Sequence, residues 1–84
     1  MQTTSNMDWI INLEDMTCRN IDTDIVIIYE RDGDDILGRI KELPNKIYEQ
    51  WAYREDGAIL FKQILKEARE IFLKVYIENW MTAN

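Results

Sequence analysis

The densest group of side chains that could do chemistry is Asp32-Gly33-Asp34-Asp35, where three carboxylates fall within four residues. Calcium sites in EF-hands need oxygen ligands at alternate loop positions and a later Glu, and this stretch does not supply that pattern. Carboxylates that are adjacent on a turn do not by themselves predict acid–base catalysis. The sequence favours a solvated turn, with two alternatives: a cation site, or an acidic docking tip formed by Asp32, Asp34 and Asp35 for a basic partner.

The chain has no histidine and a single cysteine, Cys18, which removes most catalytic triads and zinc sites. No family signature surrounds Cys18, so we expect a buried or idle thiol, and no internal disulfide can form. The three glycines are too far apart for a phosphate-binding loop. We therefore expect no catalytic, metal-binding or cofactor-binding residue and predict a protein that is not an enzyme. A carboxylate enzyme would instead need a concave site gathering two or more acids with perturbed pKa values.

Composition limits the partners. The 84 residues predict one domain, and the net charge is −6. Residues 1–57 carry six basic and thirteen acidic side chains, whereas residues 58–84 carry four and three. This excess of acid argues against direct binding to nucleic acid or to an anionic membrane, because both need Lys and Arg. With no signal peptide and no apolar run long enough to span a membrane, we expect a soluble, cytoplasmic protein.

Residues 58–81 predict one long helix that the rest of the chain packs against. Asp56 precedes it as a candidate N-cap. One stripe is apolar and expected to be buried: Phe61, Ile64, Leu65, Ala68, Ile71, Phe72 and Val75.

A second apolar group projects from the other side of the last turns of this helix: Leu73, Ile77, Trp80 and Met81. Large apolar groups clustered on a surface mark interfaces, and Trp is enriched at binding hot spots. We interpret these four residues as a protein-interaction surface for a second copy or another protein. Two alternatives remain: residues 9–11 of the same chain cover them, or the helix end is frayed.

Residues 24–41 predict a β-hairpin with its turn at Asp32-Gly33, or with a four-residue loop from Asp32 to Asp35. The two-residue turn would pair Tyr29 with Ile36, and it would place Glu30 opposite Asp35, a clash that the longer loop avoids. One face is expected to pack on the helix: Ile25, Ile27, Tyr29, Ile36 and Ile40. The other face, with Val26, Ile28 and Leu37, suggests that the first strand is internal to the sheet, covered on both sides, or at an interface.

The remaining segments are less regular. Residues 1–7 are polar and predict a flexible tail, so the single domain is expected over residues 8–84. Residues 8–13 form an apolar patch that could be strand or helical turn, and residues 16–19 could be a short edge strand. Residues 45–53 favour a short helix over a third strand. The predicted fold class is α+β: a small antiparallel sheet built on the hairpin and packed against the long C-terminal helix.

The order of hairpin, short segment and long helix resembles the small module of HicB-type antitoxins over residues 25–78. The matching features are the Asp32-Gly33 turn, Leu43-Pro44, Glu55-Asp56-Gly57 and Glu67-Ala68. The chain departs from that family in lacking its Gly and Cys after the Leu-Pro step and its Thr at the helix entry. The resemblance implies a dimer-forming protein binder, an inhibitor of a basic partner.

Two functions of the binding class follow. The first is a non-enzymatic interaction module that forms a homo-oligomer through the C-terminal helix. The second is an acidic, antitoxin-like inhibitor that presents the Asp32–Asp35 tip to a basic partner protein. Self-association through apolar groups should be indifferent to salt, whereas docking through carboxylates should weaken as salt rises.

Overall fold

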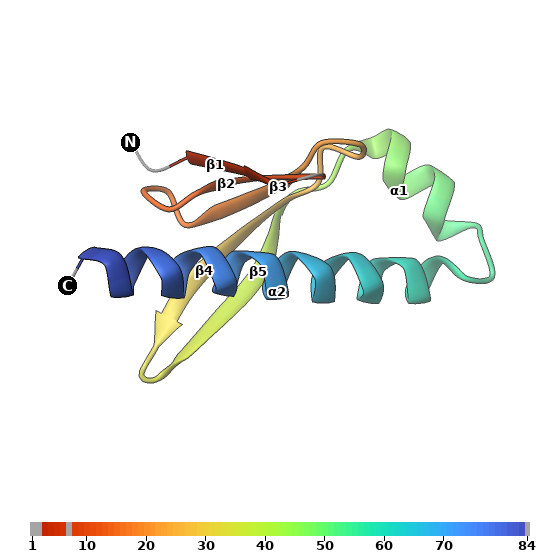
Figure 1. Ribbon diagram of the computed structural model, residues 1–84. Helices are drawn as coiled ribbons and strands as arrows, with labels where there is room; N and C mark the ends of the chain where they lie inside the picture. Colours follow the sequence, from red (N-terminus) through yellow and green to blue (C-terminus); the bar gives the residue numbers. More distant parts are fainter. Residues whose placement is uncertain (1–2, 7, 84) are drawn as a thin grey trace.

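The computed structural model describes residues 3–6 and 8–83, which form one antiparallel sheet and two helices (Figure 1). The α+β fold, with a sheet packed against a long C-terminal helix and a short helix before it, is therefore confirmed. The elements are β1 (Thr3–Asn6), β2 (Trp9–Asn12), β3 (Thr17–Asn20), β4 (Val26–Asp32), β5 (Asp35–Glu42), α1 (Asn45–Ala52) and α2 (Gly57–Ala83).

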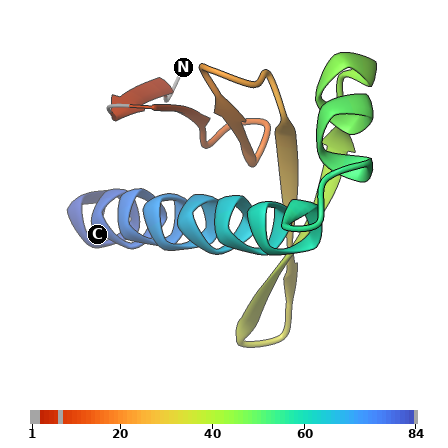
Figure 2. The same ribbon diagram turned by 90° about the vertical axis from the view of Figure 1, so that its right-hand side faces the viewer.

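The sheet has the order β1-β2-β3-β4-β5, so every strand pairs with its neighbour along the chain. Its strands are strongly twisted relative to one another, as strand sterics favour. In Figures 1 and 2, β1 to β3 lie along one side of α2, while the β4–β5 hairpin crosses the helix steeply and its turn projects beyond it. One sheet thereby covers two sides of one helix.

The core lies between the sheet and the middle of α2. Tyr29 of β4 stacks on Phe72 of α2, with ring centroids 4.2 Å apart and planes at 14°. Such stacking stabilises the pair beyond what the burial of the two rings contributes. Side chains alternate between buried and half-buried along β2, as the period of a strand requires. The buried apolar residues are Trp9, Ile11, Cys18, Ile25, Ile27, Tyr29, Ile36, Ala68 and Phe72.

The hairpin is confirmed, with a corrected turn. Asp32 pairs with Asp35, so the two-residue turn is Gly33-Asp34 rather than Asp32-Gly33. This register agrees with the longer-loop alternative, and it places Gly38 opposite Tyr29. Gly33 has φ +63°, and positive φ at the first central position alone is typical of a type II′ turn.

The predicted helix-facing set of the hairpin is correct except at its outer edge. Ile40 lies opposite Ile27, as a core residue would, yet it is 37% exposed because β5 is the last strand of the sheet. On the other face Leu37 is half exposed, whereas Val26 and Ile28 on the internal strand β4 are half-buried.

The N-terminal region holds more structure than its polar sequence suggests. The tail predicted over residues 1–7 contains β1, which pairs with β2 from Thr3↔Asn12 to Asn6↔Trp9, while residues 1, 2 and 7 lie outside the described residues. The apolar patch becomes β2. The short strand predicted near Cys18 exists as β3, but it lies between β2 and β4 instead of at an edge.

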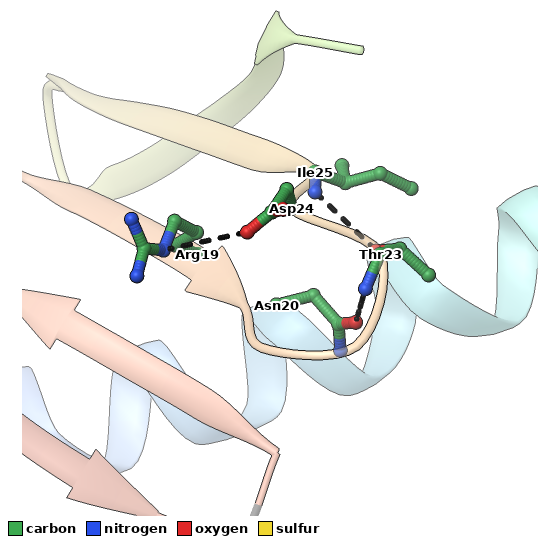
Figure 3. A network of polar contacts seen from close by, with 5 residues as sticks. All are labelled: Arg19, Asn20, Thr23, Asp24 and Ile25. Atoms are coloured by element: carbon green, nitrogen blue, oxygen red, sulfur yellow. Dashed lines mark hydrogen bonds and ion pairs between the residues drawn. The ribbon is translucent and has the colours of Figure 1, made fainter. Parts of the chain in front are cut away.

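A polar network shapes the β3–β4 connection (Figure 3). Asn20 is 5% exposed, and its Oδ1 accepts hydrogen bonds from the backbone N–H and the hydroxyl of Thr23, both at 2.9 Å. Asp24 has φ +61° and donates its N–H to the Asn20 carbonyl. These bonds satisfy a buried amide oxygen and turn the chain so that Ile25 enters the core.

The short helix predicted over residues 45–53 is confirmed as α1, which follows Pro44. The turn after it begins α2 at Gly57. The Asp56 carbonyl accepts the first helical hydrogen bond from Leu60, but its carboxylate is held by Arg54 at 2.8 and 3.0 Å. This ion pair lowers the pKa of Asp56, chiefly through the hydrogen bond from Arg54.

Gly57 allows close approach of this turn to α1, because a Cβ there would lie 1.9 Å from the Trp51 carbonyl oxygen. Helix propensity alone predicts that Gly57→Ala stabilises by up to about 1 kcal/mol. We expect the opposite sign, a loss of about 2 kcal/mol in the free energy of unfolding, because backbone would have to move.

Urea unfolding of Gly57→Ala measures this effect, with the exposed neighbour Ala58→Gly as the control that reports propensity alone. Ala58→Gly should cost no more than about 1 kcal/mol. A Gly57→Ala protein as stable as the wild type would show that the close contact is unimportant.

Candidate interaction surface

The β4–β5 turn and the last turns of α2 form one groove of about 140 Å³. Residues that the sequence assigned to separate sites meet here: Asp34 and Asp35 come from the acidic tip, and Trp80 comes from the C-terminal helix. The groove is lined by Arg31, Gly33, Asp34, Asp35, Ile36, Tyr76 and Trp80. The third tip residue, Asp32, pairs with Asp35 across the hairpin and is exposed.

Arg69 of α2 fixes the hairpin tip against the helix. Its Nη2 lies 3.1 Å from Asp35 Oδ1, and its Nη1 donates to the Ile36 carbonyl. Asp35 Oδ1 also accepts the Ile36 N–H at 2.8 Å. This backbone bond, followed by the Arg69 guanidinium, lowers the pKa of Asp35, so the residue stays a carboxylate at neutral pH.

The predicted helix surface divides into a covered and an exposed part. Leu73 is half-buried and packs against the core, so it does not belong to the exposed part. The other three residues are the helix-end patch: Ile77, Trp80 and Met81 are 50%, 61% and 67% exposed. Of the four residues that the sequence predicted to form one surface, these three are therefore at least half-exposed and Leu73 is not.

An aromatic row connects the core to the groove. Tyr76 lies parallel to Phe72 at a centroid distance of 6.0 Å, and Phe72 in turn stacks on Tyr29. Tyr76 is half-buried and forms part of the groove wall beside Trp80. The wall near Trp80 therefore rests on the rigid centre of the protein rather than on a loop.

Some residues of the site carry no clear signal in the sequence. In the sequence, Arg69 is one of the polar residues on the helix side opposite the apolar stripe, Tyr76 flanks that stripe, and Arg31 lies just before the hairpin turn. Their role depends on how the hairpin crosses α2, which local pattern does not specify. Tyr53 is 87% exposed between the two helices and does not line the groove.

Cys18 lies in the core with no exposed surface, and burial raises its pKa to about 12. The thiolate needed for nucleophilic chemistry is therefore absent at neutral pH. Within residues 3–6 and 8–83, no cluster of three or more acidic, histidine or cysteine side chains could hold a metal ion. The Asp32–Asp35 stretch thus does not form a cation site of that kind.

Comparisons with protein-family models, curated proteins and solved structures find no match. The resemblance to HicB-type antitoxins accordingly stays a prediction. Neither described helix has the length and apolar character needed to cross a membrane.

The burial of Cys18 predicts a loss of stability at alkaline pH. Well below pH 9 the thiol is protonated in both the folded and the unfolded chain, so its contribution to the free energy of unfolding does not change with pH. Between about pH 9 and 12 the unfolded chain releases the proton and the folded chain keeps it, so the free energy of unfolding falls by up to about 1.4 kcal/mol per pH unit.

Urea unfolding at about pH 8, 9 and 10 tests this slope, with Cys18→Ala as the reference that lacks the thiol. The range ends near pH 10 because burial also raises the pKa of Tyr29, whose hydroxyl begins to contribute above it. Equal slopes for the two proteins would contradict a buried, protonated Cys18.

Proposed function

We propose that this chain is a non-enzymatic protein-interaction module that self-associates through the helix-end patch. The observation that carries the proposal is the exposure of three neighbouring large apolar side chains, Ile77, Trp80 and Met81, on one helix end. Removing such a group from water is favourable in proportion to its apolar area. A chain of 84 residues has a limited core of its own, so burial against a second copy adds stability.

Charge supports a contact between two copies at this place. The whole chain carries −6, yet residues 58–84 have four basic and three acidic side chains. The segment that carries the patch therefore adds no net negative charge, and a contact made by its apolar side chains should depend little on salt. Within this proposal the protein works in the cytoplasm without a cofactor and does not contact nucleic acid directly, in keeping with its excess of acid and single thiol.

Light scattering across a concentration series tests self-association of the wild type and Trp80→Ala. We expect the wild type to approach twice the 10.1 kDa mass of one chain, and Trp80→Ala to weaken the dimer at least about tenfold, as hot-spot Trp residues do. Tyr53→Ala, which removes an even more exposed aromatic ring, should leave the dimer unchanged.

Circular dichroism must show that the variants are folded. A wild type that stays monomeric at high concentration would refute the proposal. So would a folded Trp80→Ala protein that dimerises as the wild type does.

The second candidate function is that of an acidic, antitoxin-like inhibitor, and the groove favours it. Tyr76 and Trp80 line this groove together with Asp34 and Asp35. A Lys or Arg side chain of a basic partner would gain cation–π contact and an ion pair in the same place. This function would use the acidic tip and the helix end together.

Charge reversal separates the two functions. Asp34→Lys should weaken binding of a nona-arginine probe, measured by calorimetry at low salt, by more than Asp22→Lys does, although both variants change the net charge equally. The reason is that Asp34 lines the groove whereas Asp22 lies in the β3–β4 connection. Equal losses would show that the probe senses only total charge, which would count against a groove-specific function.

A further inference from the structure

The outer strand β5 forms an uncovered edge of the sheet. It is eight residues long, and every residue except Ile36 is exposed. In the sheet order it is last, and among the described residues no other strand pairs with its outer side. Edges of this length are templates for another strand unless their backbone groups are blocked.

The edge is blocked at one end and open at the other. The N–H and carbonyl of Ile36 are bound by the Asp35 side chain and by Arg69, so both point away from β4. Residues of an antiparallel ladder alternate in direction, so Gly38 and Ile40 also point their N–H and carbonyl groups outward. The backbone of residues 38–40 is therefore available to a new strand.

A cavity of about 140 Å³ lies beside this open part, between β5 and α2. The Tyr29 ring packs over Gly38 at one side of this cavity, because it comes within 2.6 Å of the place where a Cβ would lie. The Tyr29 hydroxyl is buried and has no hydrogen-bond partner among the described residues. The cavity is lined by Ile27, Tyr29, Gly38, Leu65 and Arg69.

A side chain that faces Gly38 from an added strand would enter this cavity, because residues opposite each other in a sheet share a face. Ile27 and Leu65 suit a short β-branched side chain. Threonine would combine the methyl group with a hydroxyl that can accept from Tyr29 or Arg69. Leaving a buried hydroxyl without a partner is costly, so satisfying Tyr29 would favour binding.

A second copy of β5 does not fit this edge. The register that pairs Gly38 with its own copy places Ile36 opposite Ile40, and the backbone groups of Ile36 are already bound. Moving the second copy along the edge by two residues places Arg39 opposite Arg39. Moving it by two more residues places Arg39 opposite Lys41, so like charges face each other in both registers.

The charges beside the open edge select another type of strand. Arg39 and Lys41 are both exposed and alternate with Gly38 and Ile40, so they project from the opposite face of β5. Arg39 also lies 3.5 Å from Glu30, an exposed ion pair that water screens. Acidic side chains on the outer face of an added strand would face these two cations.

We propose that β5 binds an extended segment of another protein by strand addition at Gly38–Ile40. The segment alternates acidic residues, which face Arg39 and Lys41, with short β-branched residues, one of which fills the cavity beside Gly38 and Tyr29. Main-chain hydrogen bonds supply the attraction, and the cavity and the two cations supply selectivity. This surface is separate from the helix-end patch and does not depend on self-association.

The test is an NMR titration of the full chain with the capped peptide Glu-Thr-Glu-Thr-Glu. We expect amide shifts concentrated at residues 38–41, and slower hydrogen exchange at Gly38 and Ile40. The same peptide with both Thr nitrogens methylated should not bind, because it cannot donate to the edge. The Lys-Thr-Lys-Thr-Lys peptide should bind more weakly.

Matched variants locate the charge effect. Lys41→Glu should weaken binding about two- to fivefold, the range of exposed ion pairs, whereas Lys62→Glu on α2 makes the same change in net charge and should have no such effect. The titration is repeated on Trp80→Ala, which should bind the peptide normally. Absence of binding at millimolar peptide, equal binding of the methylated peptide, or shifts centred away from β5 would each overturn the proposal.

Discussion

The structure depends on one constraint: a 27-residue helix with a long apolar stripe has to be covered by strands that are only four to eight residues long. A flat sheet of such strands would cover one side of α2. The twist between successive strands lets β2 and β3 contact one side of the helix while β4 and β5 cross it on another. Phe72 lies where these two parts meet, fully buried and stacked on Tyr29.

Polar anchors fix the two parts of the sheet to the same helix. In the N-terminal part, Trp9 Nε1 donates to Glu67 Oε1 of α2 at 2.8 Å, so a buried indole is satisfied. In the hairpin, Arg69 binds Asp35 and the Ile36 carbonyl. Glu67 and Arg69 are two residues apart on a helix and so project in different directions. Neighbouring residues of α2 thereby hold the sheet at two distant places.

The elements that could be predicted from the sequence are those whose signal is local. The period of the apolar residues indicates α2, and Gly33 between β-rich segments indicates the hairpin, because each pattern reports on a single element. β1 could not be predicted, since its Thr and Ser residues carry no alternation and it forms by pairing with β2. The place of β3 inside the sheet likewise depends on long-range pairing.

The candidate site was predictable only in pieces. Acidic residues at a turn and an exposed Trp on a helix are visible in the sequence, but their meeting in one groove requires the angle at which the hairpin crosses α2. The sequence left two registers open because Asp32-Gly33 and Gly33-Asp34 both suit a tight turn. The two registers differ by two residues, so the same strand faces meet the core in both and the apolar pattern does not choose between them. Packing of Tyr29 over Gly38 favours the observed register.

Arg69 links the two surfaces proposed for this protein. By binding the Asp35 carboxylate it holds the acidic tip beside Trp80, and by binding the Ile36 carbonyl it closes the first part of the β5 edge. The same guanidinium therefore determines where the groove forms and where the edge becomes available to a new strand. The groove is acidic and aromatic, whereas the open edge is flanked by Arg39 and Lys41. On these proposals the two surfaces select partners of opposite charge, so binding at one does not compete with binding at the other.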